Sequence, residues 1–191
     1  MEKVRKKILA IALCVICLSL VMAGTVAYYT ASDTAHNVIT SGGVDITLQE
    51  WADKAKTVPF PKNGVNNVMP GAEITKIAEV KNTGSSDAFV RVAVKKSITL
   101  AKGVKGDPDP GLLHIELNRS AWKDGGDGYY YYMKVLAPGK TTEPLFASVT
   151  FDHNMDNIYQ NSTAAVDVTA YAVQTANNGS DAFSAEGWPK A

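Results

Sequence analysis

Apolar and polar residues alternate along most of the chain after residue 43, in short stretches. In the first stretch, Val44, Ile46 and Leu48 are separated by polar residues, which is the period of two that a half-buried strand shows. Five further stretches repeat this period. Their apolar sets are Ile74, Ala78, Val80; Ala88, Val90, Val92, Val94; Leu113, Ile115, Leu117; Leu145, Ala147, Val149, Phe151; and Val166, Val168, Ala170, Ala172. The pattern predicts strands throughout and offers little evidence of helices.

Turn-forming residues separate these stretches. Met69-Pro70-Gly71 and Ala137-Pro138-Gly139 combine a proline that fixes φ with a glycine that tolerates a positive φ. Residues 129–136 add a strand by composition, because aromatic residues fit a pleated surface. Seven or eight short strands with one apolar face each are what two packed sheets require. The sequence therefore predicts an all-β fold, an antiparallel β-sandwich.

The first 27 residues follow a different pattern. A basic cluster that includes Lys3 and Arg5 precedes an uncharged run from Ile8 to Ala23, and small residues follow up to Ala27. These are the three parts of a signal peptide, so we expect a helical leader over residues 1–27, cleaved by a signal peptidase between Ala27 and Tyr28. The alternative is an uncleaved membrane anchor, because a spanning helix needs about 20 apolar residues.

Cleavage would leave residues 28–191 as one secreted domain, with membrane contact only through the leader. This part has 15 Lys and Arg against 18 Asp and Glu, which does not indicate a nucleic-acid partner. Both cysteines, Cys14 and Cys17, lie in the leader, so the mature chain has no thiolate nucleophile and no disulfide. Residues 174–191 form a tail with a predicted helical turn around Ala182, Phe183 and Ala185.

Candidate metal ligands are few. None of the three histidines lies in an H-E-x-x-H motif, and His114 has only Glu116 on the same side of its strand. Asp124 and Asp127 are the nearest candidates for a cation site, but they lack the ligand spacing of a calcium loop. A second loop, residues 152–157, is also rich in oxygen ligands. Turn formation explains both loops more simply, so we expect no metal, no cofactor and no catalytic site.

Four consecutive tyrosines, Tyr129 to Tyr132, form the most conspicuous polar-aromatic run. On a strand, Tyr129 and Tyr131 face one way and Tyr130 and Tyr132 the other. A structural role is favoured, with one pair in or near the core. The alternative is a binding surface, for which Tyr130 and Tyr132 would be the exposed pair.

Several motifs resemble a known family. The junction Gly24-Thr-Val-Ala27, continuing to Asp33, and the segment from Asn37 to Leu48 resemble Gram-positive proteins with a SipW-dependent signal peptide. Met69-Pro-Gly71 leading to Asn82-Thr-Gly84 is similar to a second segment of the same group, although Ala72 stands where an acidic residue is common. On these motifs the chain is similar to the TasA/camelysin (CalY)-like family.

The resemblance implies a jelly-roll-like sandwich, secretion to the cell surface or biofilm matrix, and self-association into fibres. In such fibres the segment after the cleavage site leaves its own subunit and adds a strand to the next. Here that donor segment is residues 28–41, with Tyr28, Tyr29, Val38 and Ile39 as assembly residues. A monomeric surface-binding or adhesion module is the alternative. A camelysin-like metallopeptidase is a further one, for which the sequence offers no zinc motif.

Overall fold

The computed structural model describes residues 37–41, 44–62 and 69–189, and all of them belong to one compact unit, Thr34–Ala191. The predicted leader, its cleavage site at Ala27 and Tyr28, and Tyr29 lie outside the described residues. Across the part of the chain that is described, no helix is both long and apolar enough to cross a membrane.

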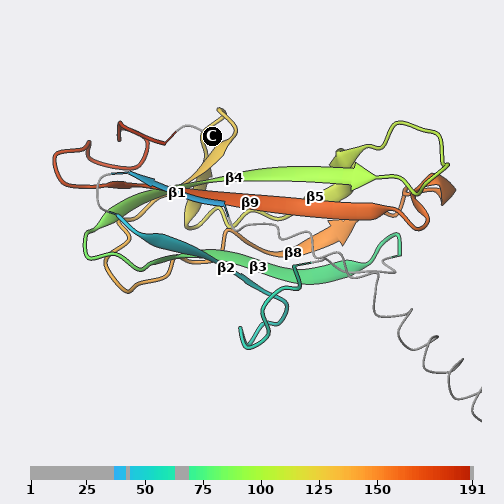
Figure 1. Ribbon diagram of the computed structural model, residues 1–191, viewed down its shortest axis with the longest axis horizontal. Helices are drawn as coiled ribbons and strands as arrows, with labels where there is room; N and C mark the ends of the chain where they lie inside the picture. The colour runs from blue at the N-terminus through green and yellow to red at the C-terminus, as the bar shows by residue number, and fades with distance from the viewer. Residues whose placement is uncertain (1–36, 42–43, 63–68, 190–191) are drawn as a thin grey trace, which may run out of the picture. The chain divides into compact units, whose positions relative to one another are not determined.

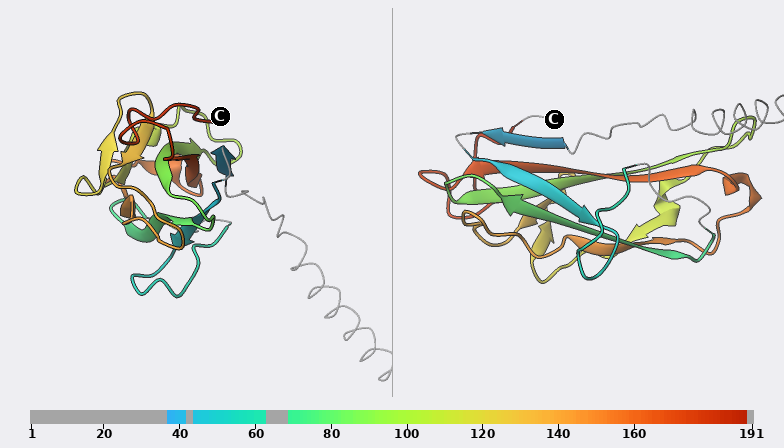
Figure 2. Two further views of the ribbon diagram at one scale, coloured as in Figure 1. Left: turned by 90° about the vertical axis from the view of Figure 1, so that its left-hand side faces the viewer. Right: turned by 60° about the horizontal axis from the view of Figure 1, so that its bottom comes forward.

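Nine strands form two sheets, which pack face to face as two layers (Figures 1 and 2). Sheet A has the order β1-β9-β4-β7-β6, and sheet B has the order β2-β3-β8-β5. The strands are β1 (Asn37–Ser41), β2 (Ile46–Trp51), β3 (Glu73–Asn82), β4 (Ala88–Thr99), β5 (Leu113–Ile115), β6 (Trp122–Asp124), β7 (Tyr129–Tyr132), β8 (Phe146–Phe151) and β9 (Thr163–Gln174). Two short 3₁₀ turns, η1 (Pro110–Leu112) and η2 (Asn157–Tyr159), lie in connections.

The predicted all-β sandwich is confirmed, with two differences. The described residues form nine strands rather than seven or eight, because Asn37–Ser41 and Trp122–Asp124 add two short strands to the seven alternating or aromatic stretches. The pairing is also not wholly antiparallel, since β1 runs parallel to β9. The alternation of apolar and polar residues does not show whether neighbouring strands run parallel or antiparallel. It also did not show that β1 would pair with β9, which lies near the other end of the chain.

The core between the sheets follows the predicted alternation. Val44, Ile46 and Leu48 are buried, and Ala88, Val90 and Val92 are buried opposite them. Trp122, Leu113 and Phe146 fill the other half of the core and are almost fully enclosed. A second, smaller cluster lies on the outer side of sheet A, where the tail covers Phe89, Tyr131 and Val173.

Buried Asn82 joins the two layers at one end of the sandwich. Its side-chain amide donates hydrogen bonds to the carbonyls of Ser86 and Leu136, both at 2.8 Å, and its Oδ1 accepts one from the Gly84 N–H at 2.9 Å. Both the nitrogen and the oxygen of this buried amide therefore have hydrogen-bond partners, as is usual for buried polar groups. It fixes the β3–β4 turn against the loop after β7.

Candidate functional site

The open edge of sheet A is the first candidate site. β1 pairs with the last part of β9 in parallel register, from Asn37 opposite Thr169 to Ser41 opposite Val173. The other edge of β9 is occupied by β4 along its whole length. Within the described residues, no strand pairs with residues 163–168 on the β1 side of β9. Among the described residues, this row of backbone groups therefore has no strand partner, and an unpaired strand edge is the kind of surface to which a further strand can add.

The predicted assembly residues fall on this edge as far as they are described. Val38 pairs with Ala170 and Ile39 with Tyr171. A five-residue parallel pairing at a sheet edge is among the weaker attachments in a sandwich. The sequence did not indicate β9 as its partner, because an edge pairing between distant segments leaves no local pattern.

The four tyrosines do not form an exposed binding pair. Tyr132 is buried in the core between the sheets, with its ring centroid 5.0 Å from that of Trp122, and Tyr130 packs against the same core. Tyr131 is buried on the outer side of sheet A, under the tail. The burial agrees with the structural role favoured for these tyrosines, and it does not support the alternative in which Tyr130 and Tyr132 form an exposed binding surface. Both faces of β7 are covered, which a single strand sequence cannot show.

Asp124 and Asp127 shape the turn between β6 and β7. Asp124 Oδ1 accepts a hydrogen bond from the Gly126 N–H at 2.9 Å. Asp127 Oδ2 accepts one from the Tyr131 hydroxyl at 2.7 Å, and this bond lowers the pKa of the carboxyl. Turn formation and the anchoring of Tyr131 account for both carboxylates in the structure.

Asp152 of the second acidic loop pairs with a histidine of β5. His114 Nε2 lies 2.7 Å from Asp152 Oδ2. The Asn154 N–H and then His114 lower the pKa of Asp152, because both interact better with the ionised carboxylate. The neighbouring His153 is not part of this pair. Its ring packs on Gly71, where an added Cβ would lie 2.3 Å from the ring Cε1.

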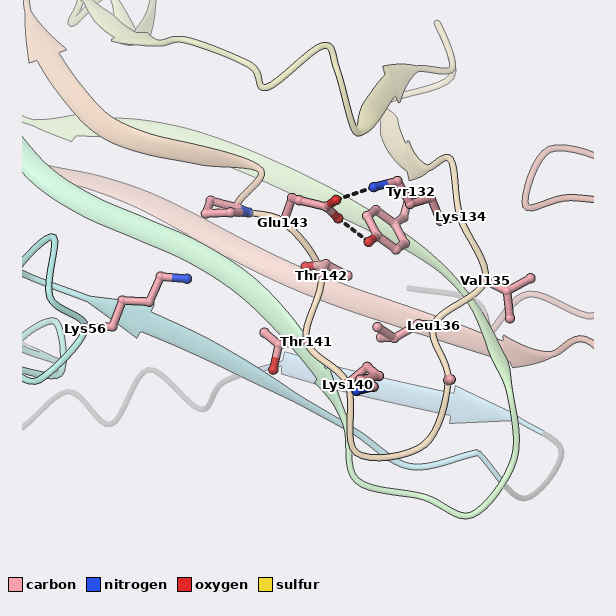
Figure 3. Close-up of a pocket in the computed structure, with 11 residues that line it drawn as sticks. Lys56, Tyr132, Lys134, Val135, Leu136, Lys140, Thr141, Thr142 and Glu143 are labelled. Carbon is pink, nitrogen blue, oxygen red and sulfur yellow. Dashed lines mark hydrogen bonds and ion pairs between the residues drawn. The ribbon is translucent and has the colours of Figure 1, made fainter.

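A shallow hollow of about 510 Å³ lies beside the loop that connects β7 with β8 (Figure 3). Tyr132 and Lys134 both point at Glu143, whose two carboxylate oxygens accept their hydrogen bonds. Lys134 and then Tyr132 lower the pKa of Glu143 to about 2, whereas burial and then Glu143 raise the pKa of Tyr132 to about 12.

The charges around this hollow largely cancel. Lys56 is paired with Glu79 and Lys134 with Glu143, which leaves Lys140 as the remaining lysine of the lining. The lining therefore lacks the concentrated positive charge that would favour an anionic ligand. The Tyr132–Glu143–Lys134 cluster instead ties the loop after β7 to the end of β7 itself.

These observations define a two-sheet β-sandwich protein with a strand from near its N-terminus attached to an open sheet edge. The chain belongs to the camelysin family: residues 3–117, more than half of the chain, match the family described as Camelysin metallo-endopeptidase. This confirms the resemblance to the TasA/camelysin-like family. No curated protein and no solved structure matches the chain.

The family description implies a metal centre, which the described residues do not fit. A metal site in a hydrolase needs about three protein ligands around one point. Among the described residues, no three His, Cys, Asp or Glu side chains are grouped in this way. His114 has Asp152 as its partner, and the His153 ring is turned onto Gly71. We therefore derive no hydrolytic step from the structure.

Proposed function

We propose that this chain is a secreted structural protein of the cell surface or extracellular matrix, which assembles into fibres by adding its N-terminal strand to the next subunit. The family assignment supports the general class. The observation that carries the mechanism is the pairing of β1 at the edge of β9, with residues 163–168 unpaired on the same side within the described residues. The edge can exchange one copy of the strand for another.

Strand exchange of this kind generates a filament. The donor surface is the segment 28–41 and the acceptor surface is the edge of β9, so the two surfaces of one contact differ. A contact between unlike surfaces does not close on itself in pairs and extends in one direction. The leader would block the donor segment before cleavage, so assembly would follow export.

The first test is a disulfide that locks β1 in its own subunit. Residues 28–191 contain no cysteine, and Asn37 and Thr169 are direct register partners, so Asn37→Cys with Thr169→Cys introduces one pair of cysteines at facing positions of the two strands. We expect the oxidised variant of residues 28–191 to remain monomeric in electron microscopy and light scattering, and to form filaments after reduction.

A matched control uses two strands that stay together in the proposal. Ser97 and Ala165 are register partners on β4 and β9, and Ser97→Cys with Ala165→Cys should not change assembly in either redox state. Deleting residues 28–41 should also leave a soluble monomer. Filaments of the deleted protein, or of the oxidised Asn37/Thr169 variant, would show that the N-terminal strand is not the assembling element.

A further inference from the structure

The C-terminal tail is folded against the sheet rather than extended from it. Asp181 Oδ1 accepts hydrogen bonds from the N–H groups of Phe183 and Ser184, at 3.0 and 2.9 Å, and so begins a single helical turn. The Asn178 side-chain amide donates to the carbonyls of Gln174 and Glu186 at 3.0 and 3.1 Å. Because Gln174 is the last residue of β9, these bonds tie the tail back onto the end of that strand.

The tail buries apolar surface on the outer side of sheet A. Ala182 and Ala185 are 2% and 7% exposed, and they pack with Phe89, Tyr131 and Val173 in a cluster separate from the core between the sheets. The Phe183 ring stacks on Tyr131 at 4.4 Å between centroids. The red end of the chain in Figure 1 accordingly lies on the side of β4 and β9 that faces away from β2 and β3.

Arg91 of β4 connects the tail with three strands. Its guanidinium lies 3.8 Å from the centroid of the Tyr129 ring and 4.6 Å from that of Trp188, and 5.4 Å from that of Tyr171 on β9. A desolvated cation between aromatic faces is held by the ring quadrupoles. The tail supplies one of these three rings, Trp188, and also the Pro189 carbonyl, which accepts a hydrogen bond from Arg91 at 3.4 Å.

The same part of β9 supports both the tail and β1. Val173 packs against Ala182 and Ala185 of the tail, and the Tyr171 ring contacts the Arg91 guanidinium. The backbone of the same segment, residues 169–173, pairs with β1. Two attachments to one strand segment are coupled when loss of the first lets that segment move. Among the described residues, the register partners of β1 all lie in this segment of β9.

From this arrangement we infer that the C-terminal tail is a clamp on the docking edge for β1: it holds residues 169–173 of β9 in place and thereby sets how readily β1 leaves its own subunit. The inference deepens the proposed function and rests on it for its biological meaning. An intact clamp keeps the donor strand in place, and a loosened clamp favours exchange.

Backbone hydrogen exchange of the monomer, residues 28–191, tests the clamp directly. We expect Trp188→Ala to speed exchange of the protected amides of residues 37–41 and 169–173 by about tenfold, and deletion of residues 175–191 to speed it further. Glu186→Ala is the matched control, because this side chain is exposed in the same tail, and it should leave exchange unchanged. A cooperative thermal unfolding transition, followed by far-ultraviolet circular dichroism, verifies that each variant is folded.

Unchanged exchange of residues 37–41 in a folded Trp188→Ala protein would overturn the clamp, whatever the deletion does. If the deletion unfolds the sandwich, the Trp188→Ala comparison decides alone. The exchange is measured on monomers, so its result does not depend on fibres. Faster exchange without any filament formation would support the clamp and reject the proposed fibre function, while filaments with unchanged exchange would do the reverse.

Discussion

Asn82 stabilises one end of the sandwich with its side chain alone. Its side chain is fully buried and bonds three backbone groups in two separate loops. Replacing it by alanine leaves buried carbonyls and an N–H without their partner, and each such group costs more than an average hydrogen bond contributes. We expect Asn82→Ala to lower the free energy of unfolding by about 2–3 kcal/mol, measured by urea denaturation. Exposed Asn157→Ala should change it by less than about 0.5 kcal/mol.

Glu143 makes stability depend on acid pH. Its pKa is about 2 in the folded protein and near its ordinary 4.5 in the unfolded chain, so the unfolded state binds the proton first as the pH falls. The stabilisation is complete above about pH 5 and is lost as the pH approaches 2. Comparing acid titrations of wild type and Glu143→Gln, we expect a constant difference in unfolding free energy at neutral pH that shrinks below pH 4.5. A difference independent of pH would mean that the carboxylate charge is not what stabilises the cluster.

For single residues, the sequence predicted which apolar side chains are buried, but it did not predict which charged side chains are buried. Val44, Ile46 and Leu48 are buried as their alternation predicts. Lys76 and Glu79 are also buried, on the same strand, and nothing in their local pattern indicates it. They are buried because they pair with Glu50 and Lys56, which other segments supply. Local periodicity reports which face a residue occupies, but it does not report which charge another segment brings to it.

Among the elements, the loop after β2 is held on sheet B by Glu79. The carboxylate of Glu79 accepts hydrogen bonds from Trp51 Nε1, at 3.0 Å, and from Lys56, and it is only 4% exposed. Asp53 shapes the loop itself by accepting from the N–H groups of Thr57 and Val58. Glu79 of β3 therefore anchors the loop after β2 through its ion pair with Lys56.

Limited proteolysis measures this anchor, because trypsin cleaves after Lys54 and Lys56 within the loop. Glu79→Gln removes the charge that holds Lys56, so we expect cleavage of the loop to become about tenfold faster. Glu73→Gln is the control, since Glu73 is exposed on the same strand, and its cleavage rate should equal that of wild type. Equal rates for both variants would mean that the loop is held by its own turn bonds.

The strands between tight turns were predictable, whereas β1 and the tail were not. The alternation of residues 88–94 gave β4 with the correct inward face. The sequence indicated residues 37–41 only as part of a donor segment, and it left the tail without a role beyond a short turn. Their positions depend on contacts with β9, β4 and β7, which are distant in sequence, and short segments of ordinary composition do not reveal such partners.

For the whole molecule, the unlike ends of the proposed contact make filaments polar. A subunit without residues 28–41 keeps an acceptor edge but has no donor strand. We expect a small fraction of this subunit, mixed with the intact protein, to occupy donor strands and stop growth at one end, which shortens filaments in electron micrographs. The oxidised Asn37→Cys/Thr169→Cys subunit neither donates nor accepts, so adding it should leave filament length unchanged.

The pairing of β1 with β9 also has a consequence for how the chain is made. Asn37 and Thr169 are about 130 residues apart, so β1 emerges from the ribosome long before the strand that it joins. Closing so large a loop is slow and comes late in folding. We therefore expect β1, the first described strand to be synthesised, to dock late, after a state in which the rest of sheet A is built but the edge of β9 is still vacant. A neighbouring molecule that offers the same strand competes with the chain's own copy during that interval.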